Sequence, residues 1–162
     1  MAYLLDANVF IQAKRLYYGL DFCPAFWEWL ILRNAERQVF SIERVGDEIE
    51  AAGDELTTWA AGRGPGFFLK PDPAMLPALG SVSSWAAAQH YEPAAVSTFL
   101  QVADYYLVAH ALAHGHTVVT LEVAKTSAKK IKIPDACIGL GVKCVTPFEM
   151  LRTERARFVL GR

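Results

Sequence analysis

The sequence predicts an α/β fold built around a parallel sheet. Short apolar or β-branched runs alternate along the chain with longer segments of helical periodicity, which is the pattern of parallel α/β proteins. The 162 residues are 53% hydrophobic and 20% charged, which is ample for a core. The chain contains no internal repeat, low-complexity tract or linker. We therefore expect one domain.

An apolar run and capping residues mark the first strand and the first two helices. Residues 3–5 form a short strand, and the triplet that follows offers Asp6 or Asn8 as the N-cap of a helix. A second helix starts at Pro24. It is apolar on nearly all sides, which is typical of a core helix and less often of a surface that binds a partner.

The next segment predicts two strands separated by a broken helix. Residues 39–41 follow a polar turn and predict a strand, and the pattern over residues 42–61 is helical with a break at Gly53. The glycine-rich residues 62–66 lack the lysine and serine of a phosphate-binding P-loop, so they predict only a loop. Residues 67–69 predict a small strand.

The second half of the chain contains the clearest helical pattern. Residues 72–89 indicate mixed loop and helix, and Pro93 begins another helix. Strong helical periodicity over residues 102–113 ends at Gly115, a residue typical of a C-terminal cap. The β-branched residues 117–120 predict the strand that follows.

The C-terminal quarter differs in charge from the rest of the chain. It contains the last expected strand, residues 142–145, and a helix begun by Pro147. Residues 121–162 carry 9 basic and 4 acidic side chains, whereas residues 1–120 carry 7 and 13. This distribution indicates a metal site beside a phosphate-binding face, or else a solvated basic helix and a charged tail.

Localisation follows from composition. No run approaches the ~18 uncharged apolar residues of a transmembrane helix. The N-terminus lacks the basic start and cleavage pattern of a secretory signal. The chain has 3 cysteines and no CxxC pair, which suits a reducing compartment. We therefore expect a cytoplasmic protein without membrane contact.

Two acids follow strands. Asp6 ends the first strand, and Glu122 lies two residues after the strand at residues 117–120. In open parallel sheets, ligands bind at the carboxyl ends of the strands. Helix capping is an equally common role for acids at such positions. The two placements indicate either a ligand site or two capped helices.

Two further acids lie beside the apolar stripes of helices. At about 100° per residue, Asp104 falls within the stripe that contains Leu107 and Val108. Buried there, it would protonate, find a cation or form an ion pair with an arginine. Glu48 flanks the apolar stripe of its own helix, whereas Asp47 falls almost opposite to that stripe.

Acids converging at one end of a sheet suit a hard divalent cation. Mg²⁺ and Mn²⁺ prefer oxygen ligands, and they polarise a phosphodiester and activate water. Without the ion, clustered carboxylates repel one another and raise each other's pKa. The candidate metal-binding and catalytic residues are Asp6, Glu48, Asp104 and Glu122.

Four segments in order resemble the motifs of PIN-domain ribonucleases, most closely VapC-like toxins of bacterial toxin–antitoxin pairs. They are LLDANVFI, V-x-x-E ending at Glu48, AD-x-x-LVAHAL and VVT-x-E. The closing IPDACIGLGVKCVTPFEML resembles the last strand and helix of that family. The resemblance spans residues 4–151. It implies a single PIN-like domain over residues 1–152, with helices on both faces of a short parallel sheet, and a charged tail over residues 153–162.

The resemblance also implies a function. It implies an endoribonuclease that uses Mg²⁺ or Mn²⁺ to activate water, acting as the toxin of a type II toxin–antitoxin pair. Its expected partners are RNA and a cognate antitoxin, and a homodimer is an alternative use of the apolar helix that starts at Pro24. Asn8 and Thr120 match polar residues that support the acidic quartet. The alternative is a degenerate, non-catalytic PIN-like module that binds RNA or protein.

Two departures from the family pattern affect the site. The family commonly has aspartate where this chain has Glu122, so Asp135 is an alternative fourth acid, with helix capping as its other role. The region of residues 62–89 is longer and more aromatic than in compact members.

A phosphatase of the haloacid-dehalogenase type is disfavoured, because Asn8 stands where its DxDxT motif has the second acid.

Basic and histidine side chains provide the remaining signals. Lys129, Lys130 and Lys132 follow Glu122 closely and are expected to contact RNA phosphates, the alternative being an exposed polar helix. The histidines at positions 110 and 114 have a spacing that binds zinc on a helix, but the glutamate of HExxH is absent. We expect these histidines to interact with the helix dipole, although the histidine at position 116 would complete a trio.

Overall fold

The computed structural model describes residues 2–161, which contain a five-stranded parallel sheet of order β3-β2-β1-β4-β5. Tyr3 of the central strand is in register with Val39 on one side and with Thr117 on the other. This confirms the predicted α/β fold with a parallel sheet. The strands are β1 (Tyr3–Leu5), β2 (Val39–Ile42), β3 (Phe68–Leu69), β4 (Thr117–Val119) and β5 (Cys144–Val145).

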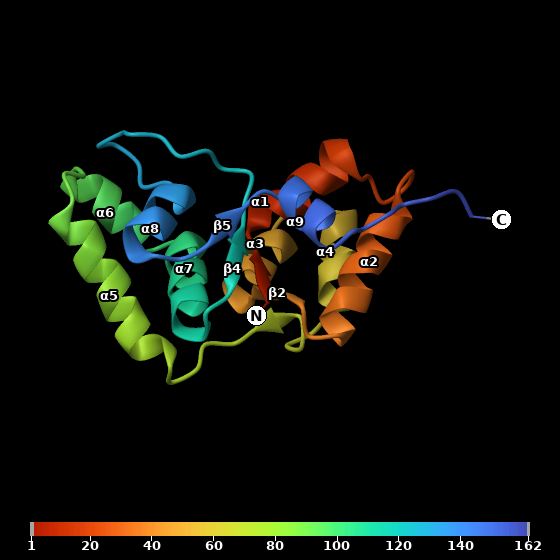
Figure 1. The fold of residues 1–162 in the computed structure, drawn as a ribbon, viewed down its shortest axis with the longest axis horizontal. Coiled ribbons are helices and arrows are strands. Elements are labelled where there is room, and N and C mark those ends of the chain that lie inside the picture. The colour runs from red at the N-terminus through yellow and green to blue at the C-terminus, as the bar shows by residue number, and fades with distance from the viewer. Residues whose placement is uncertain (1, 162) are drawn as a thin grey trace.

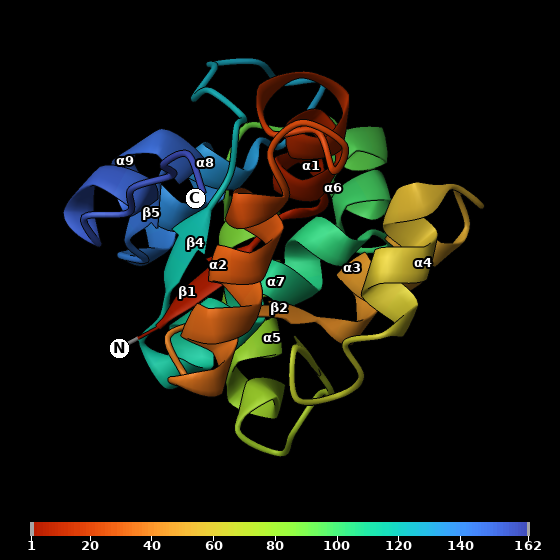
Figure 2. The same cartoon turned by 90° about the vertical axis from the view of Figure 1, so that its right-hand side faces the viewer.

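Helices cover both faces of this sheet, as expected. Figure 1 shows α5, α6, α7 and α8 on one side of the strands and α1, α2 and α9 on the other, and Figure 2 looks at the sheet from the side of α2. The helices are α1 (Ala7–Gln12), η1 (Ala13–Tyr17, a π-helix), α2 (Pro24–Ala35), α3 (Glu43–Glu50), α4 (Glu55–Ala61), α5 (Met75–Ala88), α6 (Pro93–Phe99), α7 (Ala103–His114), α8 (Ile133–Leu140) and α9 (Pro147–Thr153).

Helix ends form where the local sequence provides caps. The Asp54 carboxylate accepts hydrogen bonds from the backbone amides of Leu56 and Thr57, and the Thr57 hydroxyl accepts one from the Asp54 amide. This capping box begins α4 after the predicted break. Gly115 has φ of 68°, the left-handed conformation that ends α7. These caps fix the start of α4 and the end of α7.

Two elements were not expected. The resemblance includes the residues of α8 in the closing segment without assigning them a helix of their own, although Ile133, Ala136 and Cys137 have the i, i+3, i+4 spacing of a buried helical face. The π-helix η1 gives no comparable periodic signal. The basic segment over residues 121–132 is an irregular loop, so the alternative of an exposed polar helix there is wrong.

The aromatic region after α4 completes the core beneath α1. The fully buried Phe10 ring lies 5.9 Å from Trp59, 6.1 Å from Phe67 and 6.0 Å from Phe68, measured between ring centroids. Further along, α5 packs against α7 and α8. The longer segment over residues 62–89 therefore supports the elements that carry the acidic residues.

Helix α2 buries one face, whereas Ile31 and Leu32 on its other side are exposed. Phe26 is fully buried, and Tyr18 stacks on it with ring centroids 4.6 Å apart. Phe158, beyond α9, packs edge-on against the same two rings. Tyr3 donates a hydrogen bond of 2.9 Å to Glu154, so the segment expected as a charged tail continues along the domain surface.

Over residues 2–161, no helix combines the length and apolar character needed to cross a membrane.

Candidate active site

The four candidate acids line one cleft of about 580 Å³. Asp6 directly follows β1, and Glu122 follows β4, the neighbouring strand. Asp104 lies in the first turn of α7, and Glu48 lies on α3. The parallel strands therefore deliver two acids to the same edge of the sheet, and two helices that begin near this edge deliver the others.

Asp6 is the most buried acid of the cleft, with 4% of its surface exposed. Oδ1 accepts a hydrogen bond of 2.7 Å from the Ala7 amide, which makes Asp6 the N-cap of α1. Burial and the charges of Asp104 and Glu122 raise the pKa of Asp6 to about 7, against the lowering effect of its hydrogen bonds. Asp6 is thus both a helix cap and part of an electrostatically coupled group of acids.

Asp104 is half-buried at the start of α7. Burial and the charges of Glu122 and Glu48 raise its pKa to about 6, while Lys130 acts in the opposite direction. Within residues 2–161, it forms no ion pair with an arginine or lysine. The structural ion pair that would have explained its place in an apolar stripe is therefore not formed.

A polar network joins the ends of β1 and β4. The Thr120 hydroxyl donates to Oδ2 of Asp6 at 2.9 Å and accepts from the backbone amide of Glu122 at 3.1 Å. Asn8 donates to the same hydroxyl at 3.4 Å, and its Oδ1 accepts from the Leu121 amide at 3.2 Å. Asn8 and Thr120 thereby hold the segment that carries Glu122 against Asp6.

Glu122, and not Asp135, is the acid that lines the cleft from this loop. Its Oε2 accepts a hydrogen bond of 2.8 Å from the Ile133 amide, at the first turn of α8. Asp135 accepts instead from the Lys125 amide across the loop, at 3.1 Å. The helix-capping role expected for Asp135 is wrong, because Glu122 satisfies the exposed amide of that helix start.

Glu48 occupies the opposite rim and is exposed to solvent. Its neighbour Asp47 also lines the cleft, although the helical pattern placed it opposite the apolar stripe. That expectation assumed that the site would lie along the buried face of α3. The cleft instead opens beside the exposed side of this helix.

The donor chemistry of the cleft fits a hard cation. Asp6 and Asp104 are carboxylates withdrawn from solvent, with pKa values raised by burial and by neighbouring acids. As the side chains stand, no group of three or more His, Cys, Asp or Glu residues within positions 2–161 is arranged to hold a metal ion. The Glu122 carboxylate, which is bound to the Ile133 amide, would need to turn for the acids to converge.

Two cationic side chains share the cleft with the acids. Lys130 was among the three predicted lysines, whereas Lys129 is exposed in the loop and Lys132 precedes α8 as its N-cap residue. Arg44 was not predicted. It lies one turn before Glu48 on α3, a spacing that places both on the same side of a helix.

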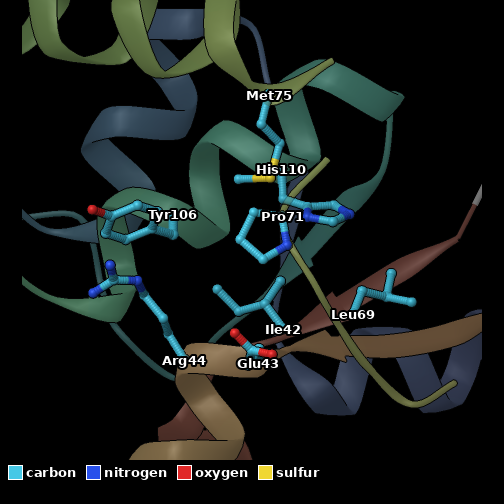
Figure 3. Close-up of a pocket in the computed structure, with 8 residues that line it drawn as sticks. All are labelled: Ile42, Glu43, Arg44, Leu69, Pro71, Met75, Tyr106 and His110. Atoms are coloured by element: carbon cyan, nitrogen blue, oxygen red, sulfur yellow. The ribbon is translucent and has the colours of Figure 1, made fainter. Parts of the chain in front are cut away.

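Arg44 is held by an aromatic ring. Its guanidinium carbon lies 3.7 Å from the centroid of the Tyr106 ring, a cation–π contact between α3 and α7. Figure 3 shows the two side chains together at the edge of a small apolar pocket, to which Arg44 also contributes. This contact fixes a positive charge beside the acids.

Comparison with known proteins gives a family and no named relative. A family model described as a domain of unknown function (DUF4411) matches residues 3–158, nearly the whole chain. No curated protein and no solved structure matches the chain.

Proposed function

The chain belongs to the DUF4411 family, and from the cleft of this member we propose a Mg²⁺- or Mn²⁺-dependent endoribonuclease. The observation that carries the proposal is that Asp6, Glu48, Asp104 and Glu122 line one cleft. Asp6 and Asp104 have raised pKa values, and the charge of Asp104 contributes to the shift at Asp6. Carboxylates held together in this way are the ligands of a hard cation.

The residues divide between metal binding and RNA binding. The carboxylates of Asp6 and Asp104 would hold the cation, with Glu48 and Glu122 completing the set from the two rims. A bound Mg²⁺ or Mn²⁺ would polarise the phosphodiester and lower the pKa of an attacking water.

The neighbouring polar residues would orient both the ligands and the RNA. The Thr120 hydroxyl fixes Oδ2 of Asp6, which leaves the rotation of that carboxylate restricted. Arg44 and Lys130 bring positive charge to a cleft that must accept a polyanion. We expect them to bind the phosphate groups that flank the scissile bond.

An RNA cleavage assay tests the proposal. We expect the purified chain to cut single-stranded RNA with Mg²⁺ or Mn²⁺ and not with excess EDTA. Asp104→Asn, purified identically, should be inactive, which excludes a contaminating nuclease. Retained RNA binding without cleavage in the wild type, and no stabilisation by either metal, would favour the degenerate binding module.

We further propose that the nuclease is the cytoplasmic toxin of a type II toxin–antitoxin pair. The support is the ordered set of four motifs that resemble VapC-like toxins. An antitoxin that inserts a basic side chain among the acids would neutralise them without activating water. Growth of cells that express the chain with and without its neighbouring gene tests this role, and equal growth with a folded, expressed wild type would refute it.

A further inference from the structure

Three histidines and an aspartate gather at the end of α7 opposite to Asp104. His110 and His114 lie on α7, and His116 lies just before β4. They line a cavity of about 400 Å³ together with Asp72, which comes from the segment between β3 and α5. That segment crosses beside α7 (Figure 1), and Figure 3 shows His110 next to Pro71 of this segment and Met75, the first residue of α5.

The spacing of the three rings suits one metal ion. The centroids of His110 and His114 are 4.9 Å apart, those of His114 and His116 are 5.7 Å apart, and those of His110 and His116 are 6.3 Å apart. With Zn–N bonds of about 2.1 Å, imidazoles around one tetrahedral zinc have centroids roughly 5 Å apart. The rings are nearly parallel, with interplanar angles of 39°, 18° and 21° for the pairs His110–His114, His110–His116 and His114–His116, so they would need to turn for their nitrogens to converge on one ion.

Two polar atoms of this cluster are buried without a hydrogen-bond partner among the described residues. His114 Nε2 lies 2.7 Å from Oδ2 of Asp72, but Oδ1 of Asp72 and Nδ1 of His116 are buried without a partner among the described residues. A carboxylate oxygen only accepts, so it requires a donor or a cation. Burying it unpaired is costly.

The protonation state of the histidines also suits metal binding. Burial, with a contribution from His114, lowers the pKa of His110 to about 4 and lowers that of His116 as well. Burial thus favours the neutral form of both rings. The neutral imidazole is the form that binds metal, and nitrogen ligands favour zinc and its transition-metal neighbours over Mg²⁺.

We propose that His110, His114, His116 and Asp72 form a second metal site, which takes Zn²⁺ or a similar divalent transition metal. Four protein ligands leave no open position, so the site is structural. It ties the segment before α5 to the end of α7 and the start of β4. The site is separate from the acidic cleft and does not depend on the ribonuclease proposal.

Zinc titration of the chain without a polyhistidine tag, in competition with a chromophoric chelator, tests this site. We expect one equivalent of tightly bound Zn²⁺ and a higher Tm with zinc. The variants His114→Ala and His116→Ala should each weaken binding at least tenfold. The matched control is His90→Ala, because His90 is the one other histidine of the chain and is exposed.

Further variants keep the test decisive. Asp72→Asn alters a half-buried side chain and should weaken zinc binding without unfolding the chain. Asp104→Asn should leave zinc binding unchanged, which separates this site from the acidic cleft. With Co²⁺, the spectrum should lack a thiolate charge-transfer band, which separates the site from the cysteines.

Unchanged zinc binding in the His114→Ala, His116→Ala double variant would overturn the proposal. Arg37 and Lys70 also line this cavity and could bind an anion there. A Tm that rises with inorganic phosphate and does not change with zinc would also overturn the proposal.

Discussion

The Thr120 hydroxyl lies 2.9 Å from Oδ2 of Asp6, although 114 residues separate them in sequence. This hydrogen bond joins the carboxyl ends of β1 and β4, the two strands that bring Asp6 and Glu122 to one edge of the sheet. It also opposes the rise in the pKa of Asp6 that burial causes. The geometry of the proposed metal site therefore depends on a residue that is not itself a ligand.

Replacing this hydroxyl tests that dependence. Thr120→Val keeps the side-chain shape but removes the bonds to Asp6, Asn8 and the Glu122 amide. We expect a loss of about 1–3 kcal/mol in the free energy of unfolding, measured in urea, and weaker metal binding. The control is Thr117→Val at the start of β4, the strand that Thr120 follows; this position is buried, and its hydroxyl forms no side-chain hydrogen bond within residues 2–161. Equal losses in both variants would contradict this role.

Stability should respond to pH through the acids of the cleft. The folded-state pKa values of Asp6 and Asp104 are raised to about 7 and about 6 from 3.8, so the folded state binds more protons than the unfolded state between these values. The contribution of these two acids to the free energy of unfolding is fully present below pH 3.8 and is lost as pH rises through about 7. His110, whose pKa is lowered to about 4, acts in the opposite direction, so wild type and variant must be compared.

The variant Asp104→Asn isolates the contribution of Asp104 to the pH dependence of stability. In EDTA at pH 8, we expect the variant to be more stable than the wild type by about 1–3 kcal/mol, and the difference should shrink toward pH 4. Adding Mg²⁺ should raise the Tm of the wild type alone, because the variant lacks one ligand. A variant less stable than the wild type at pH 8, together with a wild-type Tm unaffected by Mg²⁺, would make Asp104 a structural residue.

Glu122 and Asp135 are distinguished by a matched pair of substitutions. Glu122→Gln retains an oxygen that accepts from the Ile133 amide, so the fold should persist, but RNA cleavage should fall by at least the roughly 10- to 100-fold typical of removing a metal-site partner. Asp135→Asn should cleave almost normally, because Asp135 binds the Lys125 amide instead of lining the cleft. The reverse pattern would show that Asp135, and not Glu122, is the fourth metal-binding acid.

Basic residues should determine the salt dependence of RNA binding. Neutralising Lys129, Lys130 and Lys132 together is expected to weaken binding and flatten its dependence on salt, by about one unit of slope for each phosphate that is no longer neutralised. Lys130→Gln alone should give most of the effect, because Lys130 lines the cleft. Lys143→Gln is the control, since this exposed lysine lies at the amino end of β5, whereas the cleft lies at the carboxyl ends of the strands. An unchanged slope in the triple variant would exclude this loop from the RNA path.

The sequence predicted the features of this site that depend on local pattern. Asp6 was found because it ends an apolar strand, and Asp104 because an acid interrupts the apolar stripe of α7. Contacts between distant segments left no such pattern. The bond from Glu122 to the Ile133 amide depends on how an irregular loop folds back onto α8.

The histidine cluster illustrates the same limit. The spacing of His110 and His114 was visible in the sequence, but their partner Asp72 lies in an irregular segment about 40 residues earlier. Periodicity places residues on a face of one helix, and it does not state which loop crosses that face. Arg44 was missed for a similar reason, because its partner Tyr106 lies on another helix.

The interaction between Arg44 and Tyr106 gives the last prediction. Arg44→Gln should raise the KM for RNA more than it lowers kcat, because the charge that is removed binds phosphate and holds no metal. Tyr106→Leu should produce a smaller change in the same direction, since Arg44 keeps its charge but lacks a cation–π interaction of about 0.5–1 kcal/mol. Arg63→Gln is the matched control, because Arg63 lies over the Trp59 ring at 5.2 Å and does not line the cleft. Steady-state cleavage of a short RNA at several salt concentrations measures these effects. If Arg44→Gln and Arg63→Gln behave alike, Arg44 takes no part in binding RNA and its interaction with Tyr106 only joins α3 to α7.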